Sequence, residues 1–201
     1  GSGLYDYEII HKNRSCRLNG YGETEPISFE MKWDNCALFA IEQNDFSILA
    51  DVLKKWLIDE IEPTKLENEY DWIEVGQLAK FYENGEGLKG EFIESWNSIE
   101  RFYKQINENF IPKTLSLIKQ LKQKGFDERL RAGQSLYTFM LSRSRRHGLT
   151  QEQNFIAIRF KTNKDEMIVT DSENNELLVG KIKISDELEK IFENLATEEI
   201  S

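Results

Sequence analysis

The sequence is poor in the residues from which disulfide frameworks, metal sites and catalytic dyads are built. It has two cysteines and two histidines in 201 residues. Two thiols do not make a disulfide framework in a chain of this length, so we expect Cys16 and Cys36 to be reduced and packed. Neither His11 nor His147 has a cysteine or an acidic residue at metal-ligand spacing. We therefore expect no metal and no cofactor.

Motifs of the common nucleotide-binding and hydrolytic sites are also missing. The sequence contains no GxxxxGK[ST], no HExxH and no GxSxG. The glycine-rich run from Gly85 to Gly90 has no strand before it at loop distance, so we interpret it as the entry of a helix rather than a phosphate loop. A catalytic triad assembles from distant residues, but nothing here selects one. We expect a non-enzymatic protein.

Long apolar runs are absent as well. No run approaches the ~18 residues that a membrane helix needs, and the first residues have neither the basic nor the apolar region of a signal peptide. We attribute Gly1-Ser2-Gly3 to cloning. With 39% hydrophobic and 11% aromatic residues the chain can still build a core. We expect a soluble, cytoplasmic protein that does not bind membranes.

Positive charge is the minority charge. The chain has 26 Lys and Arg against 36 Asp and Glu, a net charge of -10. Binding to nucleic acids depends on neutralising phosphates, so an acidic protein of this kind is not expected to bind them. The same charge favours a protein partner of basic character, because opposite charges speed the encounter and sharpen specificity.

The hydrophobic pattern alternates with a period of two in the first part of the chain. "LYDYEIIH" and "ISFEMKW" are typical of strands. Asp34-Asn35 between two apolar runs predicts a hairpin, and Asn19-Gly20 has the composition of a turn. We expect an antiparallel meander over this region.

A helical period follows. Apolar residues recur at spacings of three and four after Asp45, a plausible N-cap, and Pro63 is expected to end this helix. A shorter helix is expected to end at Gly85, and Pro112 begins a later one. The clearest helical stripe is Leu88, Phe92, Trp96, Ile99, either Phe102 or Tyr103, and Ile106.

Strands are expected again after Gly133. Both faces of "QSLYTFMLSRS" are apolar, which predicts one central strand. A hairpin through Asn174-Asn175 and a helix capped by Ser185 follow. Segregated strands and helices predict an α+β fold, with antiparallel sheets from both ends of the chain packed against central helices. We expect one domain over residues 4–201, with a hinge near 59–71. Two sheet layers around the helices are the alternative.

One candidate site is the acidic segment, defined as residues 60–71. It interleaves carboxylates with apolar and aromatic residues, and aromatic residues beside charge are common at recognition surfaces. Solvated, functionless carboxylates are the alternative. The candidate partner-binding residues are Glu60, Glu62, Glu67, Glu69, Tyr70 and Asp71.

The second candidate is a cluster of arginines near the end of the expected central strand. Arg129 and Arg131 precede this strand, and the candidate anion-binding residues follow it: Arg143, Arg145, Arg146 and His147. A guanidinium in such a place pairs with a carboxylate or binds an anionic ligand. Strand parity puts Arg143 and Arg145 on one face and Arg146 on the other. Three interpretations stay open: internal pairing, a small anionic ligand, and a nucleic-acid contact.

The stretches "DVLKKWL", "YDWIEV" and "LRAGQSLYTFMLSR", with the helix of Trp96 between the last two, carry a resemblance. Over about residues 45–145 the chain resembles a bacterial family of unknown function whose members are sometimes labelled natural-product-biosynthesis proteins. The resemblance implies a bacterial source and supplies no catalytic residue.

Three functions follow from these patterns. The acidic, aromatic-rich composition resembles that of immunity proteins, which neutralise secreted bacterial toxins, and favours a protein-binding domain for a basic partner. A binding protein or accessory enzyme for a small anion would use Arg143 to His147, with His147 as acid or base. The third is a structural or regulatory subunit.

Overall fold

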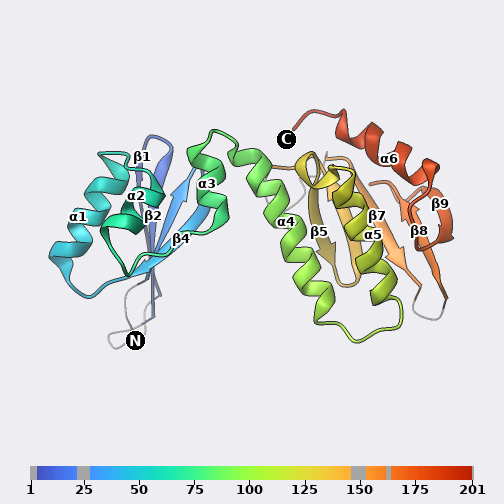
Figure 1. The fold of residues 1–201 in the computed structure, drawn as a ribbon, viewed down its shortest axis with the longest axis horizontal. Helices are drawn as coiled ribbons and strands as arrows, with labels where there is room; N and C mark the ends of the chain where they lie inside the picture. Colours follow the sequence, from blue (N-terminus) through green and yellow to red (C-terminus); the bar gives the residue numbers. More distant parts are fainter. Residues whose placement is uncertain (1–3, 22–27, 146–152, 162–163, 201) are drawn as a thin grey trace. The chain divides into compact units, whose positions relative to one another are not determined.

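The computed structural model describes residues 4–21, 28–145, 153–161 and 164–200, with only the backbone described for 4–6 and 19–21. These residues form two compact units that meet in the sequence between Gly87 and Leu88. Each unit has its own antiparallel sheet, of four and of five strands, and its own helices (Figure 1). The predicted α+β class with antiparallel sheets is confirmed.

The sheet of the first unit is the predicted meander, with strand order β1-β2-β3-β4. Its strands are β1 (Leu4–His11), β2 (Arg14–Tyr21), β3 (Ser28–Trp33) and β4 (Cys36–Glu42). The Asp34-Asn35 hairpin is confirmed, and both residues have positive φ, of 49° and 61°, as a tight two-residue hairpin turn demands. Asn19-Gly20 makes no turn, because it lies within β2 opposite β1. The turn between β1 and β2 is Lys12-Asn13, where Lys12 has φ 52°.

Three helices complete the first unit: α1 (Phe46–Leu57), α2 (Pro63–Glu69) and α3 (Gln77–Glu83). Asp45 caps α1 as predicted, and its carboxylate accepts from the backbone N–H groups of Ser47 and Ile48. The expectation that Pro63 ends this helix was wrong. The helix ends at Leu57, and Pro63 begins α2, where a proline N–H would have no partner in any case.

The core of the first unit lies between its sheet and its helices, which cover one sheet face. Trp56 of α1 is fully buried there, and its indole N–H donates to the carbonyl of Ser15. The guanidinium of Arg14 packs against the rings of both Trp33 and Trp56, 4.2 and 4.3 Å from their centres. It donates to the carbonyls of Trp56 and Ile61. These hydrogen bonds and the aromatic rings stabilise a positive charge that is removed from water. Burial lowers the pKa of Arg14.

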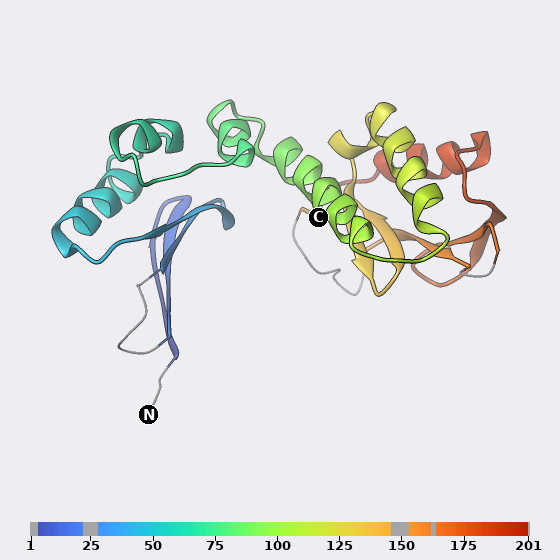
Figure 2. The ribbon, with the colours of Figure 1, turned by 60° about the horizontal axis from the view of Figure 1, so that its bottom comes forward.

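The second unit begins with two long helices, α4 (Gly87–Lys104) and α5 (Ile111–Gln123), followed by the 3-10 turn η1 (Phe126–Glu128). The predicted stripe is confirmed within α4, where Phe92, Trp96 and Ile99 are buried, but Ile106 lies beyond the end of the helix at Lys104. Gly125 takes φ 76° after α5, a conformation that favours glycine. A last helix, α6 (Asp186–Ala196), is capped by Ser185 as predicted. These helices cover one face of the second sheet (Figures 1 and 2).

The second sheet has the order β5-β6-β7-β8-β9. Its strands are β5 (Arg131–Ser135), β6 (Thr138–Ser142), β7 (Phe155–Phe160), β8 (Glu166–Thr170) and β9 (Glu176–Lys181). The prediction of one central strand over 134–144 was wrong. This stretch folds back on itself at Leu136-Tyr137, so Ser135 lies opposite Thr138. The turn has no glycine, asparagine or aspartate to reveal it in the sequence.

Two separate hydrophobic cores follow from this division. One joins the first sheet to α1, α2 and α3, and the other joins the second sheet to α4, α5 and α6. The expected hinge near 59–71 lies inside the first unit, where most of it forms α2. The expectation of one domain over residues 4–201 stays a prediction about how cooperatively the chain folds.

Candidate functional site

The acidic segment lies in the first unit, along α2 and the turns beside it. Glu69 and Asp71 are exposed, and the side chain of Glu62 pairs with Lys65 one turn along α2 at 2.9 Å. Glu60 pairs with Lys12, and this hydrogen bond lowers the pKa of the Glu60 carboxyl. The structure therefore places these carboxylates on one short stretch of surface, all of it built from residues of the first unit.

Lys55 of α1 ties this stretch to the preceding helix. Its ammonium pairs with Glu69, donates to the hydroxyl of Tyr70 at 2.7 Å and lies 2.9 Å from Asp51. The hydroxyl of Tyr70 in turn donates to Asp51. These bonds, that to Glu69 first, raise the pKa of Lys55, so the ammonium stays charged. The Tyr70 ring also meets Trp72 edge-on, with centroids 5.7 Å apart.

Two glutamates of this region have structural partners instead. Glu67 accepts from the backbone N–H of Val75 at 2.9 Å, which fixes the turn after α2. Glu83 of α3 accepts from both the backbone N–H and the hydroxyl of Thr64, at 2.7 and 3.0 Å, and so caps the start of α2. Glu67, one of the six predicted partner-binding residues, therefore has a structural role in the turn after α2.

The arginine cluster lies in the second unit, and its described members bond to the chain itself. Arg143 donates to two backbone carbonyls, those of Glu198 at 2.9 Å and Arg129 at 2.6 Å. Arg129 makes a two-pronged bond to Glu193 of α6, at 2.7 and 2.8 Å. Partial burial lowers the pKa of Arg143, and the bond to Glu193 raises that of Arg129.

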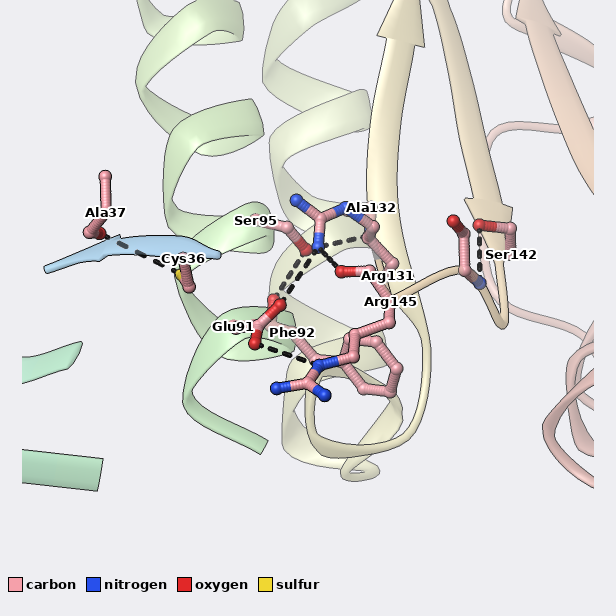
Figure 3. Close-up of polar contacts among 10 residues, drawn as sticks. Cys36, Ala37, Glu91, Phe92, Ser95, Arg131, Ala132, Ser142 and Arg145 are labelled. Carbon is pink, nitrogen blue, oxygen red and sulfur yellow. Dashed lines mark hydrogen bonds and ion pairs between the residues drawn. The ribbon is translucent and has the colours of Figure 1, made fainter. Parts of the chain in front are cut away.

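Arg145 pairs with the buried carboxylate of Glu91, in the first turns of α4 (Figure 3). Its Nε donates to Glu91 at 3.3 Å, and Arg131 of β5 approaches the same carboxylate at 4.0 Å. Arg131 also donates to the carbonyl of Arg145 at 2.6 Å. Nearby, the hydroxyl of Ser95 accepts from the N–H of Ala132 at 2.9 Å. The start of α4 is therefore bound to the chain on both sides of the β5–β6 hairpin.

These contacts support internal pairing for the two described residues of the predicted anion site. Arg143 and Arg145 are brought to the same end of the hairpin but bond to different groups, carbonyls for one and Glu91 for the other. Arg146 and His147 lie outside the described residues. An anion site over Arg143 to His147 stays a prediction.

Sequence reasoning missed Glu91 as the partner of Arg145. A signal was present, because Glu91 and Ser95 are four residues apart and directly precede Phe92 and Trp96 of the apolar stripe. Residues that flank such a stripe share its buried edge. A carboxylate at the buried edge of a helix needs a positively charged partner. The order of residues in the chain does not show which arginine is that partner.

In the part of the chain that the structure describes, no group of three His, Cys, Asp or Glu side chains is arranged to hold a metal ion. None of the described helices combines the length and the apolar character needed to cross a membrane. Cys16 and Cys36 are not joined by a disulfide, and burial raises the pKa of Cys16 to about 12.

Comparison of this chain with protein-family models, with curated proteins and with solved structures finds no match. The resemblance over about residues 45–145 to a bacterial family therefore stays a prediction. Any function has to be argued from the chain's own charges and surfaces.

Proposed function

We propose that this protein is a non-enzymatic binding domain whose acidic first unit binds a basic protein partner, in the manner of an immunity-type inhibitor. The observation that carries the proposal is the distribution of charge between the two units. Residues 1–87 contain 18 Asp and Glu against 8 Lys and Arg, a net charge of -10. Residues 88–201 contain 18 of each sign and are neutral.

The excess is concentrated further within the first unit. Residues 45–87, which hold the three helices, have 11 acidic and 4 basic residues. Their exposed pairs, such as Glu62 with Lys65, are worth only ~0–1 kcal/mol each, so a partner's lysine or arginine can replace them at little cost. A concentrated field of one sign steers a basic partner and orients it toward this unit.

The aromatic pair beside the carboxylates supports the same surface. Tyr70 and Trp72 are partly buried, and Lys55 lies 4.9 Å from the Tyr70 ring centre. Rigid aromatic rings next to charges are common binding anchors, because they offer a large contact area at low entropic cost. Tyr70 and Trp72 are the anchors that we propose for the partner.

The test is capture of the adjacent gene's product by the purified full-length protein at about 0.05 M and 0.5 M salt. We expect capture that weakens at high salt. Reversing three charges of the acidic segment, in the variant Glu62→Lys, Glu69→Lys, Asp71→Lys, should abolish it.

A matched control reverses three exposed carboxylates of the second unit, in the variant Glu108→Lys, Glu173→Lys, Glu176→Lys. This control changes the net charge by the same amount and should retain most of the binding. Capture that ignores salt, equal losses in both variants, or no capture at all would count against the proposal.

A further inference from the structure

Strand β1 is an edge strand of the first sheet, and it exposes apolar side chains on both faces. Tyr7, Ile9 and Ile10 are 64%, 54% and 65% exposed. Tyr7 and Ile9 lie opposite Leu18 and Cys16 of β2, on the face that the helices cover. Cys16 is buried, whereas Ile9 one strand away is not. The apolar face of the sheet therefore extends as far as β1, which the helices do not cover.

Strand β1 lacks several of the usual protections against pairing with another strand, and its charged residues, Asp6 and Glu8, are both acidic. Residues 4–11 contain no lysine and no proline, and β1 pairs with β2 in unbroken register from Leu4 opposite Tyr21 to His11 opposite Arg14. In an antiparallel pair, every second residue directs its backbone N–H and C=O away from its partner strand. A regular edge of this kind is a template for an added strand.

Charge decides which strand would be added. A second copy of this chain would bring another unit of net charge -10 to the same edge, and the two copies would repel each other. An extended segment rich in Lys and Arg would instead be attracted. Glu8 lies between Tyr7 and Ile9 in the sequence, and its side chain is on the other face of the sheet from theirs. Its carboxylate accepts from the hydroxyl of Ser15 and pairs with Lys32.

We propose that β1 accepts an extended basic segment of the protein partner as a fifth strand of the first sheet, with apolar side chains of that segment against Tyr7, Ile9 and Ile10. This inference rests on the proposed function and names the part of the partner that binds. Backbone hydrogen bonds along the edge supply affinity, and the alternating side chains supply specificity.

The test uses the full chain, labelled with 15N, and a peptide of about ten residues that alternates lysine with valine. We expect the backbone amide signals of Tyr7 to His11 to shift and their hydrogen exchange to slow when the peptide is added. A peptide that alternates glutamate with valine is the control for charge and should leave these amides unchanged.

Two variants separate the edge from the general charge of the unit. Ile9→Lys places a positive charge on β1, and Ile58→Lys makes the same change at the end of α1, where the isoleucine is 56% exposed. We expect Ile9→Lys to weaken peptide binding about tenfold and Ile58→Lys by less than about twofold. Tyr7→Lys serves as a second edge variant if Ile9→Lys does not fold by circular dichroism.

Three results would overturn the inference. The first is that Ile9→Lys and Ile58→Lys weaken peptide binding equally. The second is that the peptide does not bind, or that it binds without slowing hydrogen exchange of the β1 amides. In both cases capture of the partner by the acidic segment could still hold, so the proposed function is judged separately. The third is a wild-type dimer in light scattering that Ile9→Lys dissociates, which would assign the edge to a second copy.

Discussion

Leu136 takes a left-handed backbone conformation at the tip of the β5–β6 hairpin, with φ 53°. Leucine pays about 1–2 kcal/mol for this conformation, because its Cβ crowds the following carbonyl oxygen. Its side chain is 85% exposed, so burial offsets none of that cost. The turn is instead stabilised through Tyr137, whose carbonyl accepts a hydrogen bond from the hydroxyl of Tyr103 at 3.0 Å.

Replacing this leucine should therefore stabilise the protein. We expect Leu136→Asn to raise the free energy of unfolding by about 1 kcal/mol, because asparagine tolerates the left-handed conformation. Thermal and urea unfolding followed by circular dichroism measure the change. Leu177→Asn, at an exposed leucine of β9 without positive φ, is the control and should not stabilise the protein. A lower stability for Leu136→Asn would contradict the expectation.

At the scale of elements, the buried carboxylate of Glu91 joins α4 to the β5–β6 hairpin. Its side chain is 3% exposed and faces Arg145 and Arg131. Glu94, one turn along the same helix, pairs with Arg101 at 2.7 Å but is 42% exposed. Water screens the second pair more than the first, so the two carboxylates should contribute different amounts to the free energy of unfolding.

Neutralising each carboxylate tests that difference. We expect Glu91→Gln to lower the free energy of unfolding by about 1–3 kcal/mol, because it leaves partly buried guanidinium groups without their counter-charge. Glu94→Gln should cost less than about 0.5 kcal/mol. Urea unfolding followed by circular dichroism compares the two. Equal losses would show that burial of Glu91 does not matter.

At the scale of the whole molecule, the two units differ in charge and each has its own core. One unit carries the net charge of -10 and the other is neutral, and the partner surface that we propose lies on the charged unit. Leu66 and Leu117 are fully buried leucines, one in each core. The same substitution can therefore be made once in each unit.

Leu66→Ala and Leu117→Ala should each cost about 2–5 kcal/mol through the cavity left behind. We expect each substitution to speed hydrogen exchange first in its own unit, because its lost contacts lie in one core. Exchange measured by mass spectrometry on peptides from residues 1–87 and 88–201 gives the comparison. Loss of protection in both units together would instead support the single domain predicted from the sequence.

Local patterns in the sequence predicted most elements of the fold. The period of two over "ISFEMKW", the N-caps at Asp45 and Ser185 and the hairpin at Asp34-Asn35 are all confirmed. Each depends on contacts within a few residues, which is why the sequence reveals them. The hairpin at Leu136-Tyr137 was missed because its turn residues are apolar, so two short strands had the pattern of one long strand.

Local sequence patterns and composition were sufficient to predict the α+β class, the helices other than α2, the N-caps at Asp45 and Ser185, and an acidic chain without metal or nucleotide motifs. Long-range contacts decided the rest: that Arg145 pairs with Glu91, that Arg14 packs against two tryptophans, and that β1 forms an edge with exposed apolar residues. These features pair residues about 20 to 50 positions apart, or depend on which strand has no neighbour. The spacing of residues along the chain predicts neither the distant pairs nor the edge strand, because both arise only when the elements pack together.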